Sequence, residues 1–213
     1  MRTRIKICGI TRPDDALTAA RLGADAIGLV FYAKSPRHVS MTQAVEIAAH
    51  LLPFVTSVGL FVNPSGQEVN AVLQGLRLDL LQFHGEEPPE FCRQFGVPYI
   101  KAARVKPGSD LVQYAARFHD ARALLLDAYV EGAHGGTGQA FDWGLIPAGL
   151  PLPVILSGGL TPANVEDGVR QVRPWAVDVS SGVEATEGNN ALKGIKDAAR
   201  MAAFMQGVRN AEV

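Results

Sequence analysis

Cys8 and Asp127 are the two side chains of this sequence best suited to move a proton. Cys8 ends the run Ile5-Lys6-Ile7, and Asp127 follows three leucines at 124–126. A thiol ordinarily titrates near ~8.5 and an aspartate near ~3.9, so a pocket must shift both pKa values toward neutrality to pair them as base and acid. For Cys8 alone, a small buried apolar residue is the commoner interpretation. A buried carboxylate without a partner is costly, which favours a functional or paired Asp127.

Glycine- and serine-rich segments suggest an anion site. Gly158-Gly159 lets backbone N–H groups approach a ligand closely, and Ser180-Ser181-Gly182 leads toward the next predicted helix. Phosphate is the natural ligand of such loops, although a tight turn without any ligand also uses Gly-Gly. The segment Gly135-Gly136-Thr137-Gly138 is either a phosphate-approaching loop or a plain linker. It lacks the spacing and the lysine of a nucleoside-triphosphate loop, so ATP is not indicated.

Arg37 and His84 are candidates for orienting a substrate. Arg37 stands in a loop, Ser35-Pro36-Arg37-His38, from which its planar fork of donors could reach a carboxylate. A solvated loop arginine is the alternative. His84 follows an apolar run and could orient a hydroxyl or a carboxylate, or it could be a rim histidine satisfied by its surroundings. No His, Cys, Asp and Glu residues have the spacing of a metal site, so no metal is expected.

The order of apolar and helical segments predicts how these residues are positioned. Eight short apolar runs predict strands at 4–9, 26–31, 56–62, 79–84, 98–105, 123–128, 153–158 and 176–181. Segments of helical period predict helices at 13–22, 41–52, 66–76, 88–95, 109–119, 161–172 and 190–208, with a shorter one at 141–148. Ser40 with Gln43 and Ser65 with Glu68 have the spacing of capping boxes. Thr11 and Thr161, each close before a proline, mark two further helix starts.

Eight strand–helix units predict an α/β fold, a (β/α)8 TIM barrel, with residues 1–213 forming a single domain. Most of the strands are too apolar for a sheet with one wet face and suit a parallel sheet covered on both sides. A doubly wound open sheet is the alternative, but the turn Cys8-Gly9-Ile10-Thr11 lacks the glycine-rich dinucleotide pattern. Barrel enzymes place their chemistry at the C-terminal ends of the strands, which is where the candidate residues stand.

Composition narrows the function classes. The 213 residues are 47% hydrophobic and 19% charged, with a formal net charge of -1, which makes a nucleic-acid or other polyanion partner unexpected. Two cysteines make no disulfide framework, no signal peptide is recognisable before Cys8-Gly9, and no apolar run approaches the ~20 residues of a membrane helix. We therefore expect a cytoplasmic protein with no membrane partner. The oligomeric state is left open, with a monomer as the working expectation.

Several motifs together resemble the phosphoribosylanthranilate isomerase family of tryptophan biosynthesis. They fall in the family's order at all but one of the eight predicted strand ends and cover essentially the whole chain. The matching segments are Lys6-Ile7-Cys8-Gly9-Ile10-Thr11, Gly28-Leu29-Val30-Phe31, Ser35-Pro36-Arg37, Gly59-Leu60-Phe61-Val62-Asn63, Leu81-Gln82-Phe83-His84-Gly85, Leu125-Leu126-Asp127, Gly135-Gly136-Thr137-Gly138 with Phe141-Asp142-Trp143, Leu156-Ser157-Gly158-Gly159-Leu160 and Asp178-Val179-Ser180-Ser181-Gly182-Val183-Glu184.

The resemblance implies a barrel enzyme that acts on a small phosphosugar without any cofactor. The implied reaction is the Amadori rearrangement of N-(5-phosphoribosyl)anthranilate to the carboxyphenylamino-deoxyribulose phosphate. It implies Cys8 as general base, Asp127 as general acid and Arg37 as ligand of the anthranilate carboxylate. His84 and Asp178 join the substrate-binding residues. The resemblance implies that the phosphate binds the backbone of the loops after the seventh and eighth strands, at Gly158, Gly159, Ser180, Ser181 and Gly182.

One segment departs from the family pattern, and three other functions are alternatives to the implied one. Residues 185–192 lengthen the loop after the eighth strand, which leaves open which N–H groups complete the phosphate site. A ribulose-phosphate epimerase would need metal-ligating side chains on several strand ends. An indole-glycerol-phosphate synthase relative would show a catalytic lysine at a strand end, whereas Lys101 lies within a predicted strand. A non-catalytic phosphosugar-binding regulator would have lost Cys8 or Asp127, and both are present.

Overall fold

The chain forms a closed barrel of eight parallel strands. The structure is a computed structural model that describes residues 2–128, 141–188 and 190–212. Each strand pairs with the next in sequence, and β8 pairs with β1, which confirms the predicted (β/α)8 barrel and excludes the open sheet. The strands are β1 Arg4–Cys8, β2 Ala26–Val30, β3 Thr56–Phe61, β4 Leu80–Phe83, β5 Tyr99–Val105, β6 Leu124–Ala128, β7 Val154–Leu156 and β8 Ala176–Val179.

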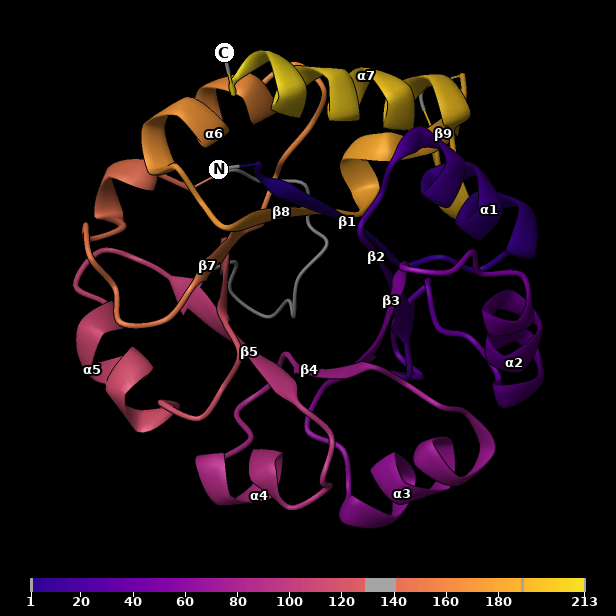
Figure 1. Cartoon of the computed structure of the whole chain (residues 1–213), viewed down its shortest axis with the longest axis horizontal. Coiled ribbons are helices and arrows are strands. Elements are labelled where there is room, and N and C mark those ends of the chain that lie inside the picture. Colours follow the sequence, from indigo (N-terminus) through magenta and orange to yellow (C-terminus); the bar gives the residue numbers. More distant parts are fainter. Residues whose placement is uncertain (1, 129–140, 189, 213) are drawn as a thin grey trace.

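Helices surround the barrel. They are α1 Pro13–Leu22, α2 Met41–Ala49, α3 Gly66–Gly75, α4 Pro89–Arg93, α5 Leu111–Arg117, α6 Val165–Val172 and α7 Ala198–Asn210, with short 3-10 turns η1 Trp143–Leu145 and η2 Ser181–Val183. Figure 1 shows the strands as an inner ring and the helices as an outer ring, with α7 between α6 and α1. Both predicted capping boxes, at Ser40 and Ser65, are present. None of the described helices is long and apolar enough to cross a membrane.

The alternation of side chains along each strand divides the core into two layers, as the strand β6 illustrates. Its Leu125 packs with residues of other strands, such as Ile100 and Ala176, in the barrel interior. The neighbouring Leu124 and Leu126 point outward and pack against Leu111 and Ala115, on α5. The leucine run before Asp127 is therefore apolar throughout because both faces of the strand are covered.

The predicted helix at 190–208 is wrong in its first part. Residues Asn190–Lys196 form a strand, β10, which pairs antiparallel with β9, Glu184–Glu187. The ladder is irregular between Ala191 and Lys196, and Gly194 has a φ of 86° there, a left-handed conformation that interrupts any helix. Helix α7 starts only after Asp197, whose side chain accepts a hydrogen bond from the backbone N–H of Arg200.

One other predicted helix start also shifts. Helix α1 begins at Pro13 as predicted, with Arg12 as the residue before it, and the Thr11 hydroxyl donates to the carbonyl oxygen of Gly194 in the β9–β10 hairpin. Helix α6 begins at Val165, because Asn164 folds the preceding residues into a turn by accepting from the Thr161 N–H and donating to the Gly159 carbonyl. The loop after β7 is thus longer than predicted.

Candidate active site

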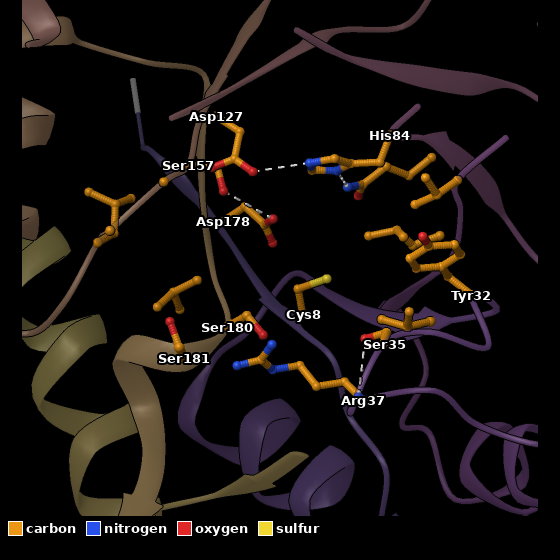
Figure 2. Close-up of a pocket in the computed structure, with 18 residues that line it drawn as sticks. Cys8, Tyr32, Ser35, Arg37, His84, Asp127, Ser157, Asp178, Ser180 and Ser181 are labelled. Atoms are coloured by element: carbon orange, nitrogen blue, oxygen red, sulfur yellow. Dashed lines mark hydrogen bonds and ion pairs between the residues drawn. The ribbon is translucent and has the colours of Figure 1, made fainter. Parts of the chain in front are cut away.

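A cavity opens at the C-terminal end of the barrel. Most of the predicted site residues line it: Cys8, Arg37, His84, Asp127, Gly158, Gly159, Asp178, Ser180 and Ser181. Figure 2 shows the Cys8 thiol and the His84 and Asp127 side chains directed toward the same space. The barrel topology thus brings together side chains that are far apart in the sequence.

Gly182 does not line this cavity, unlike the other residues of the predicted phosphate loops. It packs against the loop after β7, where a Cβ atom on Gly182 would stand 2.0 Å from the Leu160 carbonyl oxygen. A side chain at this position would push the two loops apart. Gly182 therefore holds the loop after β8 close to the loop after β7, and its contact with a phosphate stays a prediction.

The two loops present free backbone donors to the cavity. Gly158 and Gly159 follow β7 with φ values of 79° and 66°, and Ser180 and Ser181 follow β8. None of these four backbone N–H groups donates to another residue in the described part of the chain. Successive N–H groups without acceptors form a concavity suited to an anion. Gly135-Gly136-Thr137-Gly138, the third predicted loop, lies outside the described residues.

His84 and Asp127 form a buried hydrogen-bonded pair on the polar side of the cavity. His84 Nε2 lies 3.0 Å from Asp127 Oδ2, and the other carboxylate oxygen accepts from the backbone N–H of Ala128 at 2.9 Å. Gln82 Nε2 lies 2.9 Å from His84 Nδ1. Both ring nitrogens of His84 thus have partners, as the alternative of a satisfied histidine expects, and its side chain also lines the cavity.

A buried lysine behind the sheet anchors the backbone around His84. Lys101 Nζ donates to the carbonyl oxygens of Phe83 and Gly85, at 3.3 and 2.6 Å, and to Glu87 Oε2 at 2.9 Å. Glu87 in turn accepts from the backbone N–H groups of Gly85 and Asn63. Lys101 is fully buried outside the barrel interior, so it offers no amine to the cavity. A synthase-type catalytic lysine is therefore not found at this position.

Replacing Lys101 by methionine should lower the free energy of unfolding by about 3–5 kcal/mol, because Glu87 is left as a buried charge without a cation. Urea denaturation measures this change. The control is Arg170→Ala, which removes an exposed pair with Glu166, and its effect should stay below about 0.5 kcal/mol. Equal stability of the two variants would show that the Lys101–Glu87 pair does not anchor this loop.

Cys8 lies beside a buried ion pair that local sequence patterns do not reveal. Lys6 Nζ bonds Asp178 Oδ1 at 2.8 Å, and Gly28 leaves the space that both Lys6 Nζ and Cys8 Sγ occupy. Burial raises the pKa of the Cys8 thiol and outweighs the opposing effect of Lys6. Burial acts to lower the pKa of the Lys6 ammonium, but the charge of Asp178 raises it overall. Lys6 is therefore a fixed positive charge next to the thiol.

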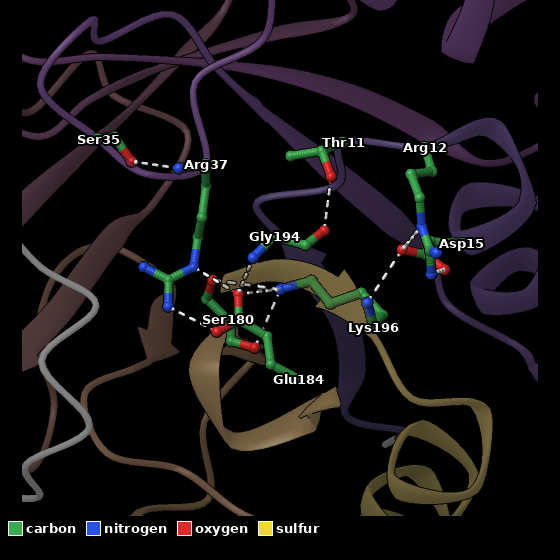
Figure 3. Close-up of polar contacts among 9 residues, drawn as sticks. All are labelled: Thr11, Arg12, Asp15, Ser35, Arg37, Ser180, Glu184, Gly194 and Lys196. Carbon is green, nitrogen blue, oxygen red and sulfur yellow. Dashed lines mark hydrogen bonds and ion pairs between the residues drawn. The ribbon is translucent and has the colours of Figure 1, made fainter. Parts of the chain in front are cut away.

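Arg37 is held by Glu184, a residue whose role was not predicted. Arg37 Nε and Nη2 bond the two oxygens of Glu184 at 2.6 and 2.8 Å, and both side chains are buried. Gly194 N–H donates to Glu184 Oε1 at 2.8 Å, and Lys196 Nζ approaches the same oxygen at 3.3 Å (Figure 3). The long segment after β8 is thus the hairpin that fixes Arg37. Arg37 is not a solvated loop residue.

The contacts among Arg37, Glu184 and Lys196 determine which of these side chains are charged. Burial acts to raise the pKa of the Glu184 carboxyl, yet the hydrogen bonds from Arg37 and the charge of Lys196 lower it overall. Glu184 is consequently ionised, and it occupies one edge of the Arg37 guanidinium. The end of the guanidinium remains available, since Nη1 donates to no other described residue. A ligand carboxylate can therefore meet this end rather than the Nε edge.

The remaining wall of the cavity is apolar. Val30, Leu60 and Val62 cluster with Cys8 on the side of β1–β3, and Tyr32 packs against them. This wall lies on the side of Tyr32, whereas the free N–H groups lie in the loops after β7 and β8, and the Arg37 guanidinium reaches toward Ser180. Among the described residues, no three His, Cys, Asp or Glu side chains are grouped as a metal site would require. The cavity thus offers free backbone N–H groups, an available end of the Arg37 guanidinium, an apolar wall and acid–base groups.

Comparisons with known proteins give one family. The family model described as N-(5'phosphoribosyl)anthranilate (PRA) isomerase matches residues 5–207. The N-(5'-phosphoribosyl)anthranilate isomerases of Nitrosospira multiformis and Pseudomonas fluorescens are similar over nearly their whole lengths. The first is 57% identical over 208 residues, which cover 98% of this chain and 97% of the relative. The second is 60% identical over 207 residues, which cover 97% and 96%.

Solved structures agree with this result. The crystal structure of phosphoribosyl anthranilate isomerase from Thermotoga maritima matches with a TM-score of 0.87 at 40% identity, covering 98% of this chain and 99% of that one. A structure of the same enzyme name, in complex with reduced 1-(o-carboxyphenylamino)-1-deoxyribulose 5-phosphate, matches with a TM-score of 0.84 at 40% identity and the same coverage. The chain therefore belongs to the N-(5'-phosphoribosyl)anthranilate isomerase family of enzymes.

Proposed function

We propose that the chain converts N-(5-phosphoribosyl)anthranilate to 1-(2-carboxyphenylamino)-1-deoxyribulose 5-phosphate in tryptophan biosynthesis, by general acid–base catalysis and without a cofactor. The observation that carries the proposal is the shared cavity of Cys8 and Asp127, which come from strands that are not neighbours. Family membership supports the substrate. A phosphosugar-binding regulator has no observation in its favour, because both groups face the cavity.

Binding at the two ends of the substrate orients its sugar. The phosphate is expected at the N–H groups of Gly158, Gly159, Ser180 and Ser181, which lack acceptors among the described residues. The aromatic ring of anthranilate suits the apolar wall, and its carboxylate suits the free end of Arg37. These contacts lie away from the bonds that change, so their binding energy can hold the sugar between Asp127 and Cys8.

The reaction then needs one acid and one base. Protonated Asp127 gives its proton to the furanose ring oxygen as the C1–O bond breaks, and the anilino nitrogen forms a Schiff base at C1. The Cys8 thiolate removes the proton from C2, which gives an enolamine. The Cys8 thiol returns a proton to C1, and the C2 hydroxyl proton passes to the Asp127 carboxylate as the ketone forms. Both groups end in their starting states.

Complementation tests the reaction directly. Expression of this chain in a tryptophan auxotroph that lacks the isomerase step should restore growth without tryptophan. The Pseudomonas fluorescens relative serves as the positive control, and the Asp127→Asn variant as the negative one. Purified protein should also convert phosphoribosylanthranilate without added metal. Growth with the relative but none with this chain, at equal soluble expression, would contradict the proposal.

Arg37→Ala should mainly raise KM, by roughly 10- to 100-fold, as expected for one lost charged hydrogen bond of about 1.5–3 kcal/mol. Steady-state kinetics with phosphoribosylanthranilate measures this, with kcat changed far less. Arg170→Ala, which removes an exposed arginine on α6, is the matched control, and its KM should equal that of the wild type. An unchanged KM would remove Arg37 from the proposed carboxylate site.

A further inference from the structure

Gln82 begins a buried chain of hydrogen bonds that ends at Asp127. It stands on β4, two residues before His84, and it is fully buried. Its amide nitrogen lies 2.9 Å from His84 Nδ1, and His84 Nε2 lies 3.0 Å from Asp127 Oδ2. The amide oxygen of Gln82 is buried and has no hydrogen-bond partner among the described residues. Such an unpaired buried acceptor is costly and calls for a physical explanation.

The amide orientation decides where His84 carries its hydrogen. With the amide nitrogen of Gln82 toward Nδ1, this ring nitrogen accepts from Gln82, and the ring hydrogen then stands on Nε2. Nε2 consequently donates to Asp127, whose two oxygens accept from His84 and from the Ala128 N–H. Asp127 is therefore an acceptor on both oxygens in this arrangement. This state of the pair holds no proton that Asp127 could give to a substrate.

We call the His84–Asp127 pair loaded when it holds the proton that Asp127 can deliver. This loaded state requires the opposite orientation of the Gln82 amide. If Asp127 Oδ2 carries a proton, His84 Nε2 must accept it, and the hydrogen of the neutral ring moves to Nδ1. If the added proton stays on the ring, Nδ1 again carries a hydrogen. In both cases Nδ1 needs an acceptor, and the amide oxygen of Gln82 becomes one when the amide turns by about 180°. The turn gives the unpaired oxygen a partner.

We propose that Gln82 is a positioning residue for the general acid, because its amide turns with each gain and loss of the proton that Asp127 delivers. The proposal rests on the proposed acid role of Asp127. In the cycle, the proton leaves Asp127 Oδ2 for the ring oxygen and returns from the C2 hydroxyl, and Gln82 exchanges no proton at any step. Gln82 also lines the cavity, and the proposal assigns its effect to His84 rather than to contact with the substrate.

The other charged side chains around His84 and Asp127 form ion pairs with one another. Lys101 and Glu87 neutralise each other behind His84, and Asp178 faces Lys6 on the opposite side of the barrel interior. Arg104, which is paired with Asp127 in the strand register, bonds Glu86. Cys8 lies across the cavity on β1. Among the side chains named here, only the Gln82 amide can present either a donor or an acceptor to Nδ1.

The hydrogen position on His84 provides a test that does not depend on activity. Long-range ¹H–¹⁵N correlation spectra of the labelled full chain report which ring nitrogen carries hydrogen, with His84→Asn identifying the signals. We expect the Nε2–H form in the wild type at high pH and in Gln82→Met. In Gln82→Glu a carboxylate faces Nδ1, so Nδ1 should carry hydrogen. The other four histidines serve as internal controls. A Gln82→Glu spectrum with hydrogen on Nε2 alone would overturn the proposal.

Kinetics separates positioning from direct substrate binding. Gln82→Met should lower kcat roughly 5- to 150-fold, the effect expected for one unpaired buried donor in the loaded state, with KM within about twofold. In the Asp127→Asn background the same change should have no further effect on kcat. Gln206→Met, on α7, is the matched control. An equal loss in both backgrounds, or a rise in KM alone, would show that Gln82 does not act through the acid.

Two outcomes distinguish this proposal from the proposed function. A wild type that turns over no phosphoribosylanthranilate contradicts the proposed function. The His84 spectra still test whether the Gln82 amide turns. If Gln82→Met does not fold, the wild type gives the answer, because its Gln82 amide resonances should shift together with the His84 ring resonances as the pH falls. Amide resonances that stay fixed while the His84 ring resonances shift would overturn the proposed turning of the amide.

Discussion

Asp127→Asn is expected to lower kcat about 10²- to 10⁴-fold, the size of a general acid–base contribution. Asparagine has nearly the shape of aspartate and can still accept from the Ala128 N–H through its oxygen, but it has no proton to transfer. The other carboxylate in the cavity, Asp178, is bound by Lys6 and does not replace it. Steady-state kinetics with phosphoribosylanthranilate gives the comparison.

Two controls accompany Asp127→Asn: the measured binding of substrate and phosphate, and a variant of the exposed carboxylate Glu86. KM and the inhibition constant of inorganic phosphate should change little, because the expected phosphate and carboxylate contacts do not involve Asp127. Glu86→Gln changes an exposed carboxylate that pairs with Arg104, and kcat should stay within about twofold. A fully active Asp127→Asn enzyme would show that another group protonates the ring oxygen.

The barrel and the position of its cavity could be predicted because they depend on local patterns. Leu124, Leu125 and Leu126 form an apolar run that only a strand covered on both faces tolerates, and the same pattern recurs around the barrel. Parallel strands share one C-terminal end, so residues directly after each run, such as His84 and Asp127, must meet there. The capping boxes at Ser40 and Ser65 are local too, and both are present.

The partners of the site residues could not be predicted in this way. Lys6 and Lys101 are each two residues or more from the predicted strand ends, and the sequence does not indicate that one faces the interior and the other the helices. Arg37 and Glu184 are 147 positions apart, and their contact depends on the β9–β10 hairpin. The residues of that hairpin have an acceptable helical period, and only its pairing and the left-handed Gly194 make it a strand. Long-range pairing decided these cases over local propensity.

Cys8→Ala should also lower kcat at least about 100-fold, because alanine leaves no base at this position. Cys92→Ala is the matched control, since Cys92 is buried in the core, away from the cavity, and its activity should match the wild type. Loss of activity in both variants would indicate a general effect on folding, and loss in neither would exclude Cys8 as the base.

The pH dependence gives the sharper test of Cys8, because burial raises the pKa of its thiol. Only the thiolate can take the C2 proton, so a raised pKa leaves most of the free enzyme inactive at neutral pH. In Asp127→Asn, which has no acidic proton to lose, the remaining kcat/KM should therefore rise with pH through and above the ordinary thiol range of ~8.5. Adding Lys6→Met removes a charge that favours the thiolate, so this rise should move to still higher pH. A remaining kcat/KM that is flat from neutral to alkaline pH in Asp127→Asn would mean that the proton leaves C2 by another route.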